Sequence, residues 1–433
     1  MMFFNPVLIS VLTMIVLCLL NLNVILAILA SALVAGVVAG IPVSETMNIL
    51  IAGMGGNSET ALSYILLGAL AMAVNKTGLA TILAQKISSI VGGRKSFLLL
   101  IIGLIACFSQ NLIPVHIAFI PILIPPLLKL MNLMKIDRRG VACALTFGLK
   151  APYIALPVGF GLIFHTIIRD QMTANGIEVS LDMIWKSVWI LGFGMFLGLI
   201  TAVFLSYRGD REYAEAQFEK EEEIEDLKMG KSHYITLLAA ILAFVVQLTT
   251  GSLPLGAICA LAIMTATKVL DWNKLDDIVA GGIGIMGFIA FVMLVAAGFG
   301  DVLRATNSIE PLVEGVVGIV GGSKLLGAGL MLLIGLFVTM GIGTSFGTIP
   351  ILAAIYCPLA SSLGFSPAGI IVLIAAAGAL GDAGSPASDS TLGPTSGLNA
   401  DGQHNHIWDT CVPTFLHYNI PLIVFGVVGA ILF

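Results

Sequence analysis

Two carboxylates lie in a short polar stretch of an otherwise apolar chain. The stretch, GDAGSPASDSTLGPTSG, runs from Gly381 to Gly397 and directly follows the apolar run 370–380. It holds Asp382 and Asp389, and its glycines and prolines are typical of irregular backbone. Irregular backbone persists at membrane depth only where protein or a water-filled cavity satisfies its polar groups. We therefore take this stretch as the candidate centre of function.

A second interrupted run carries the one basic residue that we expect at membrane depth. Lys150 begins the segment KAPYIALP, in which Pro152 and Pro157 remove backbone donors and clash with the preceding turn. An ionisable side chain inside a membrane suggests function by default, because its burial is costly. We expect Lys150 to pair with Asp382 or Asp389, either as a fixed bridge or as a pair that opens when a cation or proton binds.

Oxygen-bearing side chains gather near these two breaks and at two polar tips between apolar runs. Sodium prefers oxygen ligands, which broken helices supply as carbonyls and polar tips supply as hydroxyls and amides. Any one of these groups could instead bond within or between helices. The candidate cation- or substrate-binding residues are Ser109, Gln110, Asn111, Lys150, Tyr153, Thr344, Ser345, Asp382, Ser385, Ser388, Asp389 and Thr391. The helix-breaking positions are Pro152, Pro157, Gly384 and Pro386, and sodium is expected at Asn111, Thr344, Asp382 and Asp389.

Other polar residues have simpler interpretations. Glu59 begins an apolar run, where a helix-capping role is simpler than a gate or proton acceptor. His404 and His406, with Asp401 and Asp409, lack the spacing of a tight metal site, so we expect an exposed loop there. The isolated histidines are expected to be packed and hydrogen-bonded: His116, His165 and His417.

One pattern points to an enzyme. Residues 343–347 match G-x-S-x-G, the pattern of a hydrolase nucleophile elbow, with Ser345 as the nucleophile. That elbow needs a strand before it and a helix after it, whereas this one lies at a turn between two apolar runs. An intramembrane hydrolase is therefore a distant alternative, and we expect no enzyme activity.

The composition is that of a polytopic membrane protein. The chain has 433 residues, 58% hydrophobic and 10% charged, and many apolar runs approach the ~20 residues that a spanning helix needs. Its 48 glycines fit close packing and breaks in transmembrane helices. The net charge of −5 comes mostly from one acidic loop, so no nucleic-acid partner is expected. The six cysteines have no metal-type spacing, and no cofactor is expected.

An offset of 229 residues aligns the two halves of the chain without a gap. Residues 90–93 and 319–322 both read IVGG, and residues 120–123 and 349–352 both read IPIL. Pro157 falls on Pro386 at the same offset. These identities predict a duplicated unit. The predicted parts are a membrane repeat at 1–207, a cytoplasmic linker at 208–232 and a second membrane repeat at 233–433.

The predicted fold is all-α, with about five transmembrane helices, a re-entrant hairpin and a broken helix in each repeat. The hairpins would reverse at 109–111 and 341–345; two ordinary spans joined by a tight turn are the alternative. An odd number of spans per unit inverts the second repeat relative to the first. Lys and Arg of the short loops gather on the linker side, which predicts a cytoplasmic linker and both termini outside.

With these residues in hand, the chain resembles the sodium/proton antiporter family of the ion-transporter superfamily. The resemblance is closest to the bacterial branch that is also described as amino-acid (histidine) permeases, and its most specific part is residues 381–422. It implies cation-coupled transport by an elevator-like movement, often within a homodimer, in the bacterial cytoplasmic (inner) membrane. The Ser-Asn-Thr tips of the related carboxylate carriers are replaced here by Ser109-Gln110-Asn111 and Thr344-Ser345, which puts their carboxylate chemistry in doubt.

Two transport functions stay open. In an amino-acid transporter, Lys150 or a helix end near Ser388 would hold the substrate carboxylate, an aspartate would hold the amine, and sodium or protons would move with it. In a sodium/proton antiporter without an organic substrate, Asp382 or Asp389 would bind the two cations in turn. A zwitterion needs both signs of charge, and this pattern favours the amino-acid transporter.

Overall fold

The computed structural model describes residues 5–20, 22–77, 94–111, 120, 124, 127–128, 130–214, 229–250, 252–342, 345–385 and 388–433. Within these ranges every regular element is a helix, and the β-type pairing is a single bridge between Ile136 and Asp210. The predicted all-α fold is confirmed.

Helix starts recur 229 residues apart. The equivalent pairs are α2 (Val24–Ala39) and α12 (Leu253–Ala266), α6 (Lys95–Asn111) and α15 (Lys324–Ile342), α8 (Arg138–Ala155) and α17 (Pro367–Ala379), and α9 (Phe160–Ala174) and α18 (Asp389–Leu398). The offset found in the sequence thus recurs in the helix starts. The inverted orientation of the units and the division at 208–232 stay predictions, and residues 215–228 of the linker lie outside the described residues.

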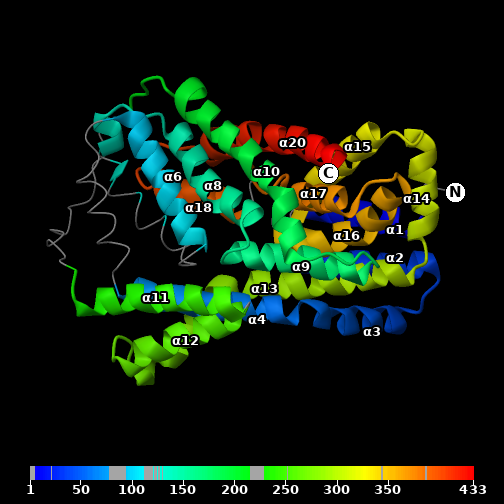
Figure 1. Cartoon of the computed structure of the whole chain (residues 1–433), viewed down its shortest axis with the longest axis horizontal. Coiled ribbons are helices and arrows are strands. Elements are labelled where there is room, and N and C mark those ends of the chain that lie inside the picture. The colour runs from blue at the N-terminus through cyan, green and yellow to red at the C-terminus, as the bar shows by residue number, and fades with distance from the viewer. Residues whose placement is uncertain are drawn as a thin grey trace.

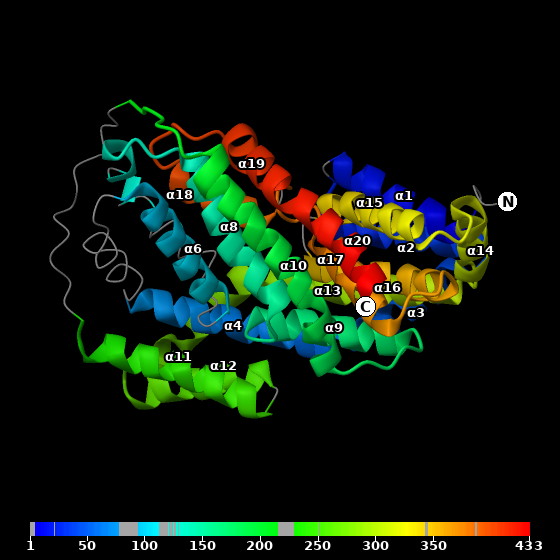
Figure 2. The same ribbon diagram turned by 45° about the horizontal axis from the view of Figure 1, so that its top comes forward.

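The remaining α-helices complete the bundle. They are α1 (Pro6–Leu19), α3 (Val43–Gly53), α4 (Ser58–Lys76), α10 (Leu181–Thr201), α11 (Lys231–Thr250), α13 (Leu275–Ala305), α14 (Ile309–Val320), α16 (Ser345–Ser362), α19 (Val412–Thr414) and α20 (Ile420–Leu432). Figures 1 and 2 show α11 and α12 as a hairpin on the outside of the bundle, beside α4.

Several helices are apolar enough to cross a membrane. Among the described residues, Leu181–Ser206, Ser345–Ser362 and His406–Leu432 are long enough by themselves. Two bent pairs raise the number to five if each pair is one span: Val43–Gly56 with Ala61–Val74, and Arg138–Ala155 with Phe160–Ala174. Six shorter apolar helices accompany them. The polytopic architecture agrees with the prediction, while five spans per repeat and the two hairpins stay predictions.

Glycine allows the long helices α4 and α13 to pack closely. A Cβ on Gly282 would lie 2.3 Å from the backbone nitrogen of Ala69, and one on Gly68 would lie 2.6 Å from the carbonyl oxygen of Gly282. Small residues let helix backbones approach in this way. Beside this pair, the broken helices α8–α9 and α17–α18 meet, with α8 packed against α18 (Figure 1).

Candidate functional site

Both predicted helix breaks are present, and local chemistry explains them. Leu156 takes an extended conformation at the end of α8, as expected of a residue that precedes a proline. The chain then turns through Gly159 at φ +58°, and α9 follows at a bend of 45°. In the second half, α17 ends at Ala379 and α18 begins at Asp389.

Glycine is required in the second break. Gly381 and Gly384 have φ of +79° and +105°, a region that side chains disfavour. A Cβ on Gly384 would also lie 2.6 Å from the Cβ of Phe415. The amide of Asn419 satisfies the freed backbone, because it accepts from the N–H of Gly381 at 2.9 Å and donates to the carbonyl of Ala383 at 2.8 Å. Sequence reasoning missed Asn419; its polarity within an apolar terminal segment was the available signal.

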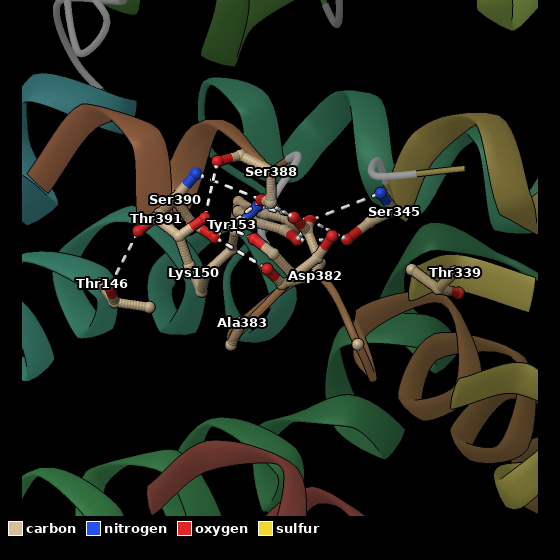
Figure 3. Close-up of polar contacts among 12 residues, drawn as sticks. Thr146, Lys150, Tyr153, Thr339, Ser345, Asp382, Ala383, Ser388, Ser390 and Thr391 are labelled. Carbon is tan, nitrogen blue, oxygen red and sulfur yellow. Dashed lines mark hydrogen bonds and ion pairs between the residues drawn. The ribbon is translucent and has the colours of Figure 1, made fainter. Parts of the chain in front are cut away.

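Asp382 is the centre of the site (Figure 3). Its carboxylate receives the ammonium of Lys150, which comes from α8, and the hydroxyl of Ser388, which caps α18. The hydroxyl of Ser345, at the start of α16, also donates to it, and the hydroxyl of Tyr153 lies 3.4 Å away. Asp382 is 1% exposed and Lys150 is 8% exposed. The ion pair therefore joins the two halves of the chain in a buried place.

Hydroxyl groups donate to backbone carbonyls in and beside the second break. Ser390 donates to the carbonyl of Asp382 at 3.0 Å, and Thr391 donates to those of Ser385 and Ser388 at 2.5 and 2.9 Å. Thr146 of α8 donates to the carbonyl of Ser390 at 2.8 Å (Figure 3). The break therefore gathers carboxylate, hydroxyl and carbonyl oxygens, the ligand types that a sodium ion takes at discontinuous helices.

The structure brings together about half of the predicted site residues. Those that converge are Lys150, Tyr153, Ser345, Asp382, Ser385, Ser388 and Thr391. Thr344 and Pro386 lie outside the described residues, as do the side chains of Ser109, Gln110, Asn111 and Asp389. Of the two partners predicted for Lys150, Asp382 holds it. The functional roles of these residues and the sodium site stay predictions.

Aromatic rings flank the ion pair on one side. Tyr153 stacks on Phe346 with ring centroids 5.3 Å apart, and its hydroxyl lies 2.7 Å from that of Ser345. Phe164, Phe160 and Tyr64 surround Phe346 at 5.6 to 6.2 Å. Sequence reasoning missed this cluster, because four helices contribute to it from distant parts of the chain.

The surroundings of Ser345 differ from those of a nucleophile elbow. The described residues before it belong to helix α15, which ends at Ile342, and not to a strand. Its hydroxyl lies against Asp382 and Tyr153. This arrangement makes Ser345 a member of the polar site, and the context that G-x-S-x-G requires is not met.

The structure describes two of the three histidines that were expected to be packed and hydrogen-bonded. His165 is buried and binds the carbonyl of Ile154 at 2.8 Å, so it caps the broken end of α8, as expected of a packed histidine. His417 binds the carbonyl of Pro413 and the hydroxyl of Ser206. His116 lies outside the described residues.

The prediction of an exposed loop around His404 is wrong for His404, Asp401 and Asp409, although Asn405 and Trp408 of the same segment are exposed. His404 is 3% exposed, and the side chain of Asp401 is fully buried against Arg138. Arg138 donates to both oxygens of Asp401, which balances the charge of this buried carboxylate. The described residues contain no group of three or more metal-ligating side chains.

Comparisons with known proteins identify the family. Residues 144–427 match the model of the Na+/H+ antiporter family, and residues 5–91 match a second model described as the Na+-H+ antiporter family. The chain belongs to the Na+/H+ antiporter family. Among relatives of this antiporter-family chain, the Bacillus subtilis protein named "Putative amino acid transporter YuiF" is 47% identical over 99% of both chains. An uncharacterized membrane protein of Vibrio parahaemolyticus is 48% identical over 98% of this chain and 99% of its own.

Two solved transporters share the fold of this antiporter-family member at 15% identity. The YdaH transporter of Alcanivorax borkumensis has a TM-score of 0.63 and covers 90% of this chain and 88% of its own. MtrF of Neisseria gonorrhoeae, described with a class of antimetabolite efflux pumps, has a TM-score of 0.61 and covers 88% of this chain and 82% of its own. The chain is therefore a membrane transporter of the Na+/H+ antiporter family.

Proposed function

We propose that this protein is a secondary active transporter coupled to sodium or protons, in which Asp382 binds the coupling ion and the transported solute is a small polar molecule, an amino acid such as histidine. The observation that carries the proposal is the buried pair of Lys150 and Asp382, set among hydroxyl oxygens where two broken helices meet. A carboxylate in that position has three competing partners: Lys150, a sodium ion and a proton.

Competition for one carboxylate couples ion binding to rearrangement. When a cation binds Asp382, Lys150 loses its counter-charge and is left in a buried place, which is costly. The unpaired ammonium of Lys150 is then stabilised if it binds an anionic group of the solute. Binding of the ion thus prepares the site for the solute, and departure of the ion restores the pair.

An amino acid matches both signs of charge in the site. Its carboxylate would bind Lys150 and the N-terminus of α18 at Ser388, where the helix dipole favours negative charge. Its ammonium would bind neighbouring carbonyls of the second break, beside the ion on Asp382. The name of the Bacillus subtilis relative supports this class of solute, and histidine is the first member to test.

Sodium/proton exchange without an organic solute is the second candidate. The descriptions of both family models favour it. In that case Asp382 binds sodium and a proton alternately, and Lys150 returns to the carboxylate between the two.

The membrane, the oligomeric state and the orientation of the transporter are also part of the proposal. The transporter lies in the bacterial inner membrane as a homodimer and works by an elevator-like movement. Its linker is cytoplasmic and its termini are outside; in Figures 1 and 2, α1 and the C-terminus lie in the half of the molecule away from the start of α11.

Proteoliposomes test the proposal directly. A sodium gradient is imposed, internal pH is followed, and uptake of labelled histidine and other amino acids is measured. Sodium-dependent uptake supports the amino-acid transporter, whereas sodium-driven pH change without solute supports exchange. Asp382→Asn should lower either activity by about 100-fold, which corresponds to about 2.7 kcal/mol of ion binding.

A matched control uses an exposed carboxylate of the same chain. Asp277→Asn, on the exposed first turn of α13, should retain full activity. If folded Asp382→Asn protein transports as fast as the wild type under every gradient, Asp382 does not bind the coupling ion.

A further inference from the structure

We propose that an apolar pocket between α12 and the start of α13 binds one zwitterionic phospholipid, phosphatidylethanolamine. The pocket has a volume of about 900 Å³. Most of its wall is apolar and comes from both helices, including Ile258, Leu261 and Val279. Its polar members are few and include Lys268, Asp271 and Trp272. This distribution matches a molecule with an apolar chain and a small charged headgroup.

The pocket lies where a headgroup is expected. Figures 1 and 2 show the α12–α13 connection at the end of the molecule where α11 begins, on the outside of the bundle. Trp272 is 75% exposed there. Tryptophan and lysine are typical of the membrane–water interface, with the indole at headgroup level. The apolar wall formed by α12 and α13 then faces the acyl chains of the same leaflet.

Lys268 has an unusual backbone conformation for a lysine, with a positive φ. The N–H of Val269 binds the carbonyl of Met264 at 2.9 Å, and that of Lys268 binds the carbonyl of Thr265 at 3.0 Å. This is a Schellman motif, in which the residue at the position of Lys268, here at φ +60°, is usually glycine. At the end of the helix before Phe365, Gly364 takes the equivalent position. The sequence thus keeps a lysine where helix termination favours glycine.

A second lysine in the same motif shows what such a residue does. Lys135, at φ +51°, donates to Glu212 at 2.6 Å. Lys268 has no carboxylate within ion-pair distance among the residues that the structure describes. Among the described residues its ammonium therefore has no carboxylate partner at the pocket, which leaves it available to a phosphate.

The charges around the pocket select the headgroup. Lys268 attracts the phosphate, while Asp271 and the first-turn carboxylates Asp276 and Asp277 of α13 repel a lipid with net negative charge. An ethanolamine ammonium is attracted by Asp271 and donates hydrogen bonds, whereas a choline headgroup has no N–H to donate. Phosphatidylethanolamine therefore fits better than phosphatidylglycerol or phosphatidylcholine.

Native mass spectrometry of the full chain tests the site. Protein in nanodiscs with equal amounts of phosphatidylethanolamine, phosphatidylglycerol and phosphatidylcholine is released, and bound lipids are counted. The wild type should retain one phosphatidylethanolamine per chain. Lys268→Gly should lower this retention at least tenfold, and glycine suits the Schellman position, so the variant keeps its fold. Asp271→Asn, which preserves an N-capping side chain, should raise phosphatidylglycerol retention.

Lys274→Ala is the matched control, because Lys274 is exposed in the same connection but does not line the pocket. It should leave retention unchanged. The proposal is overturned if Lys268→Gly retains as much phosphatidylethanolamine as the wild type, if all three lipids are retained equally, or if Lys274→Ala has the same effect. If Lys268→Gly changes the fraction of dimers but leaves lipid retention unchanged, the proposal is overturned, and a second copy of the chain occupies the pocket instead. None of these readouts depends on transport.

Discussion

Two buried ion pairs join α8 to the segments on either side of α18, and they differ in construction. Arg138, the first residue of α8, binds Asp401 just after α18; Lys150, twelve residues later, binds Asp382 just before it. The Cα atoms of the two residues lie about 18 Å apart along the helix axis. The same pair of elements is thus connected twice, once by arginine and once by lysine.

The arginine pair is a fixed joint. Arg138 donates to both oxygens of Asp401, and also to the carbonyl of Leu398 and the amide oxygen of Asn132, each at 2.9 Å. The ring of Tyr213 covers the guanidinium at 4.2 Å. Such planar, bidentate geometry is specific to arginine, which also keeps its charge. We therefore expect the ion pair of Arg138 and Asp401 to stay closed during transport.

The lysine pair is exchangeable by comparison. Lys150 is a compact point charge on a flexible stem, and Asp382 shares its oxygens with the hydroxyls of Ser345 and Ser388. Those hydroxyls stay in place if the ammonium leaves. The difference teaches that burial alone does not identify a functional charge; the number and geometry of its partners do.

The largest expected effect comes from breaking the fixed joint. Arg138→Ala should lower stability by about 3–5 kcal/mol, because Asp401 is left buried without its counter-charge. Retention of monodisperse protein after heating, followed by size-exclusion chromatography, measures the loss. The double variant Arg138→Met with Asp401→Leu should recover most of it, because an apolar pair needs no counter-charge. If the double variant is as unstable as Arg138→Ala, the other contacts of Arg138, and not only its charge, stabilise the protein.

The sequence could predict the 229-residue recurrence of helix starts and the centre of the candidate site. The 229-residue offset anticipated the starts of four helix pairs, and the prolines and glycines anticipated both breaks. Lys150 and Asp382 were found because a charge in an apolar run is conspicuous. These features depend on residues close together in the sequence, and for this reason a local pattern could predict them.

The fixed joint could not be predicted in the same way. Arg138 stands in a basic loop sequence and Asp401 in a polar one, so both resemble surface residues. Their burial depends on α8 and the segment after α18 meeting in space, which no local pattern encodes. Asn419 and the ring cluster around Phe346 were missed for the same reason.

An intermediate effect is expected from making the exchangeable pair resemble the fixed one. Lys150→Arg should slow transport by about tenfold or more, because a guanidinium held by several hydrogen bonds leaves Asp382 less readily, and each 1.4 kcal/mol is a factor of ten. Thermal stability should stay near that of the wild type. Proteoliposome uptake and the heating assay measure the two quantities on one preparation.

The reverse exchange is the control for that variant. Arg138→Lys should lower thermal stability, since the bidentate contact with Asp401 is lost, while the transport rate per folded protein stays within about twofold of the wild type. If Arg138→Lys slows transport as much as Lys150→Arg does, the two pairs are not functionally distinct.

The smallest effect concerns pH and arises at His404, a buried histidine near the fixed joint. Burial is the main cause that lowers the pKa of His404; Asp409 and Asp137 raise it, Arg138 and Arg211 lower it, and the resulting pKa is about 4. Between pH 6.5 and 4 the unfolded chain therefore binds more protons at this residue than the folded chain, and stability falls as the pH falls.

The loss should be about 1 kcal/mol between pH 6.5 and 5.5, since one pKa unit corresponds to about 1.4 kcal/mol. His404→Gln should reduce the dependence by this amount, and Asp382→Asn should leave it unchanged, because the exchangeable pair lies at the other end of α8. Heating assays at both pH values measure it. An equal pH dependence in wild type and His404→Gln would place the titrating group elsewhere and separate His404 from the joint beside it.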